Sequence, residues 1–303
     1  MSQAQKNIRG IFAIILAMAF FVANDTLVKL AREHWGTGQT LVIRGIFALV
    51  MLAIWIVATR QMHALRHIYG KLVILRAVLE CLVAMLFIAA LGMMGLAEIT
   101  AILMLAPLVI TALSIVFFHE QVGWRRWLAI LVGFAGMLLV VQPGSGATPL
   151  LATGMALLST LLVACRDIVT RKLPEGTSSI IVTLATTIGT TLGGAALVAV
   201  GDGWKPIFLS PILTLAGAAL FVLVGNYAVI EAYRGTELSV VSPFRYSVIV
   251  WAVVLAILVF GDWPSVLSLI GIALIGLSGV YTLHRERVRR REALETQNPS
   301  IST

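Results

Sequence analysis

The stretch that decides the fold occurs twice, as TAILMLAPLVITALSIVFFHE at residues 100–120 and as VVSPFRYSVIVWAVVLAILVFGD at residues 240–262. Each copy is an apolar helix that contains one proline and ends on an acid, Glu120 or Asp262. Each is followed by another apolar segment with a Gly-x-x-Gly pattern near its end. A repeat of this size predicts a chain built from two similar halves, which is typical of membrane proteins with internal repeats.

The composition places the chain in a lipid bilayer. Of its 303 residues, 59% are hydrophobic and 12% are charged, and the mean hydropathy is +0.99. Soluble domains carry about 25% charged residues, and about 20 apolar residues suffice for a helix to cross the hydrocarbon core. We expect ten transmembrane helices, at residues 10–30, 38–58, 72–92, 96–118, 124–141, 150–171, 178–200, 211–233, 238–260 and 264–283.

The net charge of +8 is explained by membrane orientation rather than by nucleic acid binding. With a cytoplasmic N-terminus, the inner segments hold 15 of the 22 Lys and Arg residues and the outer segments hold 3. The positive-inside rule therefore predicts that both termini are cytoplasmic. The basic tail at 285–292 either lies against anionic head groups or is a solvated flank of the last helix.

Two halves of five helices each must cross the membrane in opposite directions, because five is an odd number. We therefore expect an all-α integral membrane protein with two inverted five-helix repeats around a central cavity. The first repeat would occupy residues 1–144 and the second, with the basic cytoplasmic tail, residues 145–303. The polar segment at 142–149, which has no charged residue, would be the external linker between them.

The leading helices of the two halves each end on an acid followed four residues later by a base. These are Asp25 with Lys29 and Asp167 with Arg171. A separation of four places both groups on one helix face. Each pair is either an interfacial ion pair that ends a helix or part of a gate that closes one side of the membrane.

Ionisable groups near the bilayer centre need a partner or a wet cavity, because each costs roughly 2.5–3.5 kcal/mol on insertion. Arg76 and Glu80 lie four apart on one helix and are either an internal salt bridge or part of a substrate pathway. Arg245 follows Pro243, where the proline removes a backbone donor. It would hold a carboxylate of the substrate or pair with Glu80 or Glu231.

The aromatic residues of the later helices either form a wall for a ligand or fill gaps between helices. The expected pathway residues are Glu80, Met104, Pro107, Tyr227, Glu231, Pro243, Arg245, Tyr246 and Trp251. The expected members of gating ion pairs are Asn24, Asp25, Lys29, Arg76, Arg166, Asp167 and Arg171.

No catalytic pattern is present in the sequence. It has no zincin pair, no Ser/His/Asp set and no glycine-rich phosphate loop. Cys81 and Cys165 provide neither a disulfide framework nor metal-ligand spacing. We expect no enzyme activity, cofactor or bound metal, and an intramembrane enzyme remains the remote alternative.

Several short motifs together resemble the drug/metabolite transporter superfamily in its ten-helix EamA-type branch. The resemblance covers residues 8–285 and includes Trp124 and Trp127. Its motifs are Ala23-Asn24-Asp25…Lys29, Ile43-Arg44-Gly45, Leu75-Arg76-Ala77, Pro107…Phe117-Phe118-His119-Glu120 and Ser242-Pro243-Phe244-Arg245-Tyr246…Phe260-Gly261-Asp262. Asp262 stands where the family usually has glutamate.

This resemblance implies a bacterial inner-membrane carrier that works by alternating access, as a monomer or weak homodimer. Within the family the chain is most similar to amino-acid exporters of the aromatic type. Arg245 would then bind the carboxylate of a zwitterion, and Glu80 or Glu231 its ammonium. The alternative is an uptake or exchange carrier for a larger metabolite such as S-adenosylmethionine.

Overall fold

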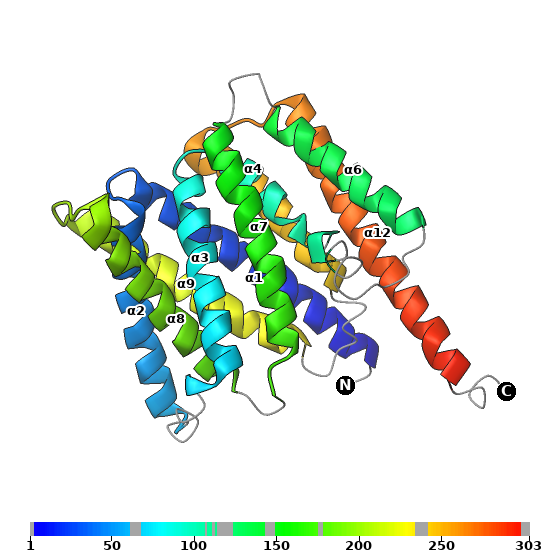
Figure 1. Ribbon diagram of the computed structural model, residues 1–303, viewed down its shortest axis with the longest axis horizontal. Helices are drawn as coiled ribbons and strands as arrows, with labels where there is room; N and C mark the ends of the chain where they lie inside the picture. Colours follow the sequence, from blue (N-terminus) through cyan, green and yellow to red (C-terminus); the bar gives the residue numbers. More distant parts are fainter. Residues whose placement is uncertain are drawn as a thin grey trace.

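The computed structural model is all-helical over the part of the chain that it describes (Figure 1). It describes residues 3–60, 68–106, 108–110, 113, 124–142, 149–174, 178–233 and 242–297. The α-helices are α1 (Gln3–Arg32), α2 (Thr37–Ala58), α3 (Lys71–Leu91), α4 (Leu96–Leu103), α6 (Trp124–Val141), α7 (Leu150–Arg171), α8 (Ser179–Leu197), α9 (Leu209–Tyr233), α11 (Ser247–Leu255) and α12 (Val266–Gln297).

Ten apolar segments were expected, and the helices agree with this expectation. Six described segments, which belong to α1, α2, α3, α7, α8 and α9, are long and apolar enough to cross a membrane. Four shorter apolar segments complete the set, at Leu96–Ile110, Trp127–Val141, Phe244–Phe260 and Val266–Tyr281. The chain is therefore an integral membrane protein.

The packing of the helices relates the two repeats to each other. α1 packs against α9 as α7 packs against α3, and α2 contacts α9 as α8 contacts α3. The pairs α2–α8, α4–α11 and α6–α12 bring together helices in equivalent positions of the two repeats. Exchanging the repeats thus preserves every one of these contacts, as the predicted inverted-repeat fold requires.

Two of the predicted helices are not continuous, and each contains a proline. Instead of one helix at 238–260, the structure has a 3₁₀ turn at Ser242–Tyr246, then α11, then a π-helical segment at Ala256–Phe260. The segment closes at Gly261, whose φ of 68° is left-handed and suits glycine. Similarly, α4 ends at Leu103. The Leu103 carbonyl has no helical partner, because the residue four positions later is a proline and has no N–H to donate.

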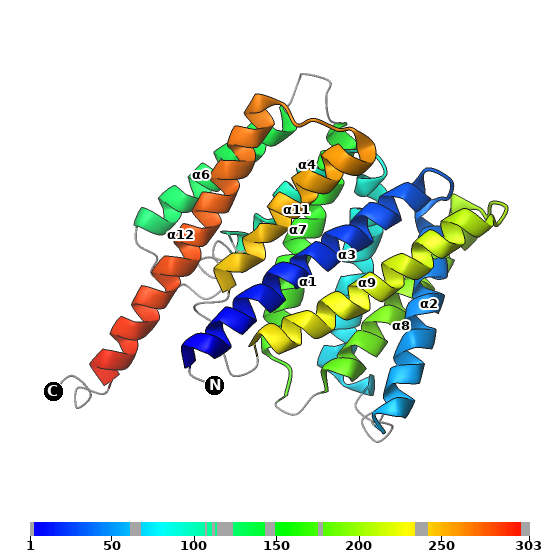
Figure 2. The same ribbon diagram turned by 180° about the vertical axis from the view of Figure 1, so that it is seen from behind.

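α6 and α12 pack against each other as a pair at one edge of the molecule, well apart from α2 and α8 (Figure 2). They cross where Gly136 faces Gly271, and a Cβ on either residue would collide with the backbone carbonyl of the other. α12 then continues to Gln297 as one helix, so the basic tail extends the last apolar segment without a break.

Candidate functional site

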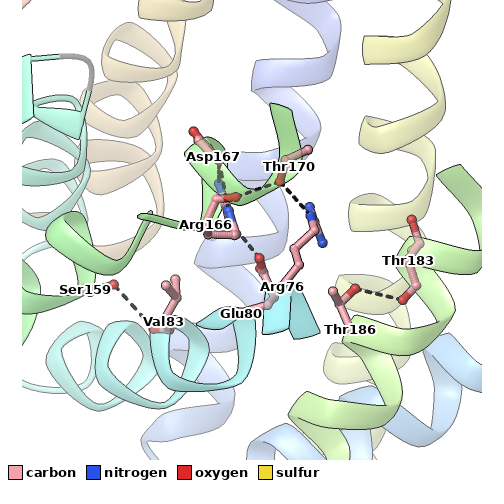
Figure 3. Close-up of polar contacts among 9 residues, drawn as sticks. All are labelled: Arg76, Glu80, Val83, Ser159, Arg166, Asp167, Thr170, Thr183 and Thr186. Atoms are coloured by element: carbon pink, nitrogen blue, oxygen red, sulfur yellow. Dashed lines mark hydrogen bonds and ion pairs between the residues drawn. The ribbon is translucent and has the colours of Figure 1, made fainter. Parts of the chain in front are cut away.

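Arg166 joins the two repeats through a cluster of charged groups between α3 and α7. Its Nη1 donates to Glu80 Oε2 at 2.8 Å, and its Nη2 and Nε donate to Asp167 Oδ1 at 2.8 and 3.0 Å (Figure 3). The side chains of Arg166 and Glu80 are 20% and 26% exposed. The pair is therefore half-buried, where a charge-assisted hydrogen bond is stronger than at a fully wet surface.

Arg76 completes this cluster but does not pair with Glu80 as predicted. Its Nε donates to Thr170 Oγ1 at 2.9 Å, and that hydroxyl donates to the Arg166 carbonyl at 2.8 Å. The predicted Arg76–Glu80 salt bridge is wrong because Glu80 lies within reach of Arg166 on the other repeat. We call Arg76, Glu80, Arg166, Asp167 and Thr170 the α3–α7 charge network.

The charge network lies on the inward faces of both helices. The exposed apolar side chains of α3 are Ile74, Leu75, Val78 and Leu82, and those of α7 are Leu150, Leu151, Leu158 and Leu161. At 100° per residue, these residues occupy the sides of the two helices opposite the charged groups. The polar face and the lipid face are thus already separated by sequence spacing. Towards the middle of the helices the contact becomes buried, where Ser159 Oγ lies 3.4 Å from the Val83 carbonyl (Figure 3).

A second polar group lies on α1 and α2. Asn24, which is 4% exposed, donates from Nδ2 to Asp25 Oδ1 at 2.8 Å. Arg44 Nη1 approaches Asn24 Oδ1 at 3.4 Å. Asn24 therefore links a carboxylate and a guanidinium inside the first repeat, as expected of a group that compensates charge within a span.

Lys29 binds residues of both repeats at the end of α1. Its Nζ donates to the Met94 carbonyl at 3.0 Å, lies 3.7 Å from Asp262 Oδ2 and stands 4.7 Å from the centre of the Phe260 ring. The predicted Asp25–Lys29 pair is wrong, because Lys29 reaches across to the second repeat instead. We call Lys29, Met94, Phe260 and Asp262 the Lys29 cluster.

The Lys29 cluster borders a cavity of about 520 Å³. Its walls are the turn and helix start at 92–98 and the segment at 261–264, with Ala256 and Lys29. Near this end the repeats also meet at Gln39, whose Nε2 donates to the Lys205 carbonyl and whose Oε1 accepts the Lys205 amide, both at 2.9 Å. These contacts join the two repeats at the Lys29 end.

The predicted aromatic wall is only partly assembled. Met104, Tyr246 and Trp251 are half-buried and pack against the main hydrophobic core. Tyr246 lies against Gly279 of α12, where a Cβ would collide with its ring. Tyr227, in contrast, is 47% exposed and its ring centre lies 5.6 Å from that of Trp55, so its predicted place beside the other three is wrong.

Arg245 does not pair with Glu80, one of the three partners that the sequence suggested for it. It lies within the 3₁₀ turn, one residue before its end, with an exposed side chain, and Glu80 is already bound to Arg166. The expected Arg245–Glu80 pair is therefore wrong. Pro107 lies outside the described residues, and so do the side chains of Arg171, Glu231 and Pro243, so their predicted roles stay predictions.

Sequence reasoning did not select three groups that the structure places in these clusters. Thr170 lies four residues after Arg166, a spacing that could have identified it as a neighbour on the same face. Arg44 belongs to one of the motifs of the resemblance, but the sequence does not assign it to a site. Asp262 was noted as the acid that ends a repeat, but nothing in the sequence shows that it meets Lys29.

Comparison with known proteins gives consistent matches over nearly the whole chain. The family model described as "EamA-like transporter family" matches residues 8–142 and again residues 150–283. A riboflavin transporter of Rhizobium johnstonii is 29% identical over 76% of this chain and 75% of its own length. An S-adenosylmethionine uptake transporter of Rickettsia bellii is 22% identical over 92% of this chain and 94% of its own length.

A solved crystal structure has the same fold. It covers 95% of this chain and 99% of its own chain with a TM-score of 0.59, at 17% sequence identity. This likeness supports the arrangement of the helices. The two separate family matches agree with the two repeats seen in the packing.

Proposed function

The chain belongs to the EamA-like transporter family, and from this premise we propose that it takes up or exchanges a metabolite larger than a simple amino acid. The path would run between the two repeats. The observation on which this proposal depends is that two ion pairs, Lys29–Asp262 and Arg166–Glu80, join the repeats at different depths. Contacts of this kind can be broken on one side and kept on the other as one repeat rocks against its partner.

The relatives favour a metabolite carrier over an exporter of amino acids. Those reported above are a riboflavin transporter and an S-adenosylmethionine uptake transporter. The expected resemblance to aromatic amino-acid exporters has no support among them. Uptake or exchange of a larger metabolite such as S-adenosylmethionine, the alternative from the sequence, is therefore the proposal we adopt.

We assign the role of outer gate to the Lys29 cluster. The charge bias along the chain favours cytoplasmic termini, which places the end of α1 on the outer side. Lys29 there contacts a carbonyl of its own repeat and a carboxylate and ring of the other. Release of Asp262 and Phe260 would separate the repeats beside the cavity that Lys29 lines. With this orientation the charge network would lie in the inner half and would meet substrate arriving through that gate.

The proposal is tested with purified protein in liposomes preloaded with unlabelled compound. Counterflow of labelled S-adenosylmethionine, riboflavin and phenylalanine is measured against protein-free liposomes. We expect saturable counterflow of S-adenosylmethionine or riboflavin, with phenylalanine slower than either. Failure of all three compounds to move would contradict the proposal, and movement of phenylalanine alone would restore the amino-acid exporter.

A further inference from the structure

We propose that Asp25 on α1 is a proton-binding site, and that the proton bound there couples transport to a pH difference across the membrane. This inference rests on the proposed carrier function and adds the ion that drives it. The ligand is a single proton exchanged with water, and it is held on one carboxylate oxygen of Asp25.

The two repeats carry equivalent acids that are held by different neighbours. The family matches begin at residues 8 and 150, and the same spacing separates Asp25 from Asp167. In each repeat the residue before the acid donates to its Oδ1. The donor is Nδ2 of Asn24 in the first repeat, and Nε and Nη2 of Arg166 in the second. The same geometry therefore gives Asp167 a charged partner and Asp25 a neutral one.

Asp25 is in no direct ion pair within the part of the chain that the structure describes. Arg44 is the described charged group that interacts with it electrostatically, but the Arg44 guanidinium contacts Asn24, at 3.4 Å. Arg44 also interacts electrostatically with Glu80 of the charge network. Proton uptake by Asp25 therefore breaks no direct ion pair and leaves Arg44 a second carboxylate, whereas proton uptake by Asp167 would break one.

The other elements packed against α1 bring no second charge to Asp25. α1 lies between α9 and α11 (Figure 2), which have no charged residue at 209–229 and 247–255. Glu98 at the start of α4 interacts with Lys29, and Arg245 in the 3₁₀ turn has an exposed side chain. A charged carboxylate is costly in such apolar surroundings, and a bound proton removes that cost.

The cavity beside Lys29 gives Asp25 a route to water. Asp25 is half-buried, and Lys29, which lines the cavity, lies four residues further along the same helix face. At 1.5 Å per residue the two positions are about 6 Å apart along the axis. Hydronium in the cavity gives up one proton and becomes water, while one Asp25 oxygen gains an O–H bond. The proton returns to water when the carrier opens to the other side.

Accumulation of labelled substrate in liposomes under a pH difference tests the inference. The substrate is S-adenosylmethionine or riboflavin, whichever shows counterflow, and potassium with valinomycin holds the membrane potential at zero. Coupling to one proton lets a difference of one pH unit sustain at most about tenfold accumulation. Beyond the level in protein-free liposomes, we expect accumulation by the wild-type protein under one of the two opposite pH differences and none at equal pH.

Asp25→Asn should abolish this accumulation, because an amide does not exchange a proton under these conditions. Its side-chain oxygen still accepts the hydrogen bond from Asn24, so the local structure is kept. Asp25→Glu keeps an exchangeable proton and should retain the accumulation. The matched control is Glu33→Gln, which removes an exposed acid just beyond the end of α1 and should accumulate substrate as the wild-type protein does.

A measurement on the wild-type protein does not depend on the folding of any variant. Dicyclohexylcarbodiimide reacts with protonated carboxyl groups within membranes, and peptide mass spectrometry locates the product. We expect labelling of Asp25 that decreases as the pH rises, with little labelling of Asp167. Labelling of Asp167 but not of Asp25 would overturn the inference.

The transport outcomes separate this inference from the proposed function. Counterflow without accumulation under either pH difference overturns the inference and leaves the proposed function standing. Equal accumulation by folded Asp25→Asn and by the wild-type protein also overturns the inference alone. No counterflow of either compound overturns both.

Discussion

At the scale of single residues, Arg166 has the largest number of charged contacts in the charge network. It holds Glu80 from the other repeat and Asp167 beside it. Removing one partner of a half-buried ion pair usually costs more than the pair contributes, because the remaining charge stays desolvated. The guanidinium is therefore expected to matter for folded yield as well as for transport.

We predict that Arg166→Gln lowers the thermal midpoint and the monodisperse yield. The expected loss in free energy of unfolding is about 1–3 kcal/mol. The double variant with Glu80→Gln should recover part of this loss, because it removes one of the stranded carboxylates. Fluorescence-detected size exclusion after heating measures both effects. If the single variant is as stable as the wild-type protein, the network does not join the repeats.

Lys29 gives a second prediction at this scale, concerning access of a reagent to the wall of the 520 Å³ cavity. Ala97 is buried and lies in the cavity wall. It is replaced by cysteine in a protein whose Cys81 and Cys165 are replaced by alanine, and the new thiol is treated with a membrane-impermeant reagent. Lys29→Gln should increase the labelling rate, since it releases Asp262 and Phe260. Lys205→Gln, which changes an exposed lysine near the same end, is the control. Equal rates in all three proteins would remove the cluster from the gate.

At the scale of helices, the packing of α6 against α12 depends on the close approach of two glycines. A Cβ at Gly271 would meet the Gly136 carbonyl, whereas a Cβ at Gly276 on the same helix would meet nothing within 4 Å. Overpacking a close contact lowers the free energy of unfolding by about 1–3 kcal/mol. An exposed substitution usually changes it by less than about 0.5 kcal/mol. The two positions therefore form a matched pair.

We predict that Gly271→Leu lowers the thermal midpoint of the purified protein, whereas Gly276→Leu leaves it nearly unchanged. The measurement is the same heating assay in detergent, with both variants compared against the wild-type protein. A similar drop in thermal midpoint in the two variants would mean that added bulk anywhere on α12 disturbs its packing against α6. No loss in either would mean that the helices can separate at Gly136 without cost.

At the scale of the whole molecule, the orientation in the membrane is still a prediction. The 15-to-3 charge bias places both termini in the cytoplasm and the 142–149 linker outside. A cysteine at Ser145, which lies outside the described residues, should react with an impermeant reagent in intact cells. Reaction only after lysis would reverse the assignment.

The helical architecture could be read from sequence because hydrophobic length and repeat symmetry are local patterns. The duplicated segment, the six long spans and the four shorter ones all followed from such patterns. The partners of charged residues could not be read in the same way. Lys29 and Glu80 each have a candidate partner four residues away, yet both bind the other repeat instead. The partner of each charged residue is decided by how α1, α3 and α7 are placed in space. Spacing along one helix carries no information about that placement.

The proline-containing segments show a second limit of sequence reasoning. The expected continuous helix at 238–260 is a 3₁₀ turn, a short α-helix and a π-helical segment. Proline predicts that the regular helix is interrupted, but not how the chain recovers its hydrogen bonds. In that segment Arg245 is exposed, whereas its neighbour Tyr246 packs on Gly279.

The central claim is that substrate passes between two repeats whose separation requires release of the Lys29 cluster. Its most direct test is counterflow of labelled S-adenosylmethionine or riboflavin through protein with cysteines at Lys29 and Asp262, in the background without Cys81 and Cys165. A short, reducible bifunctional thiol reagent then links the two positions. We predict counterflow before linking, its loss when the repeats are joined and its recovery on reduction. Undiminished counterflow through fully linked protein would contradict the account.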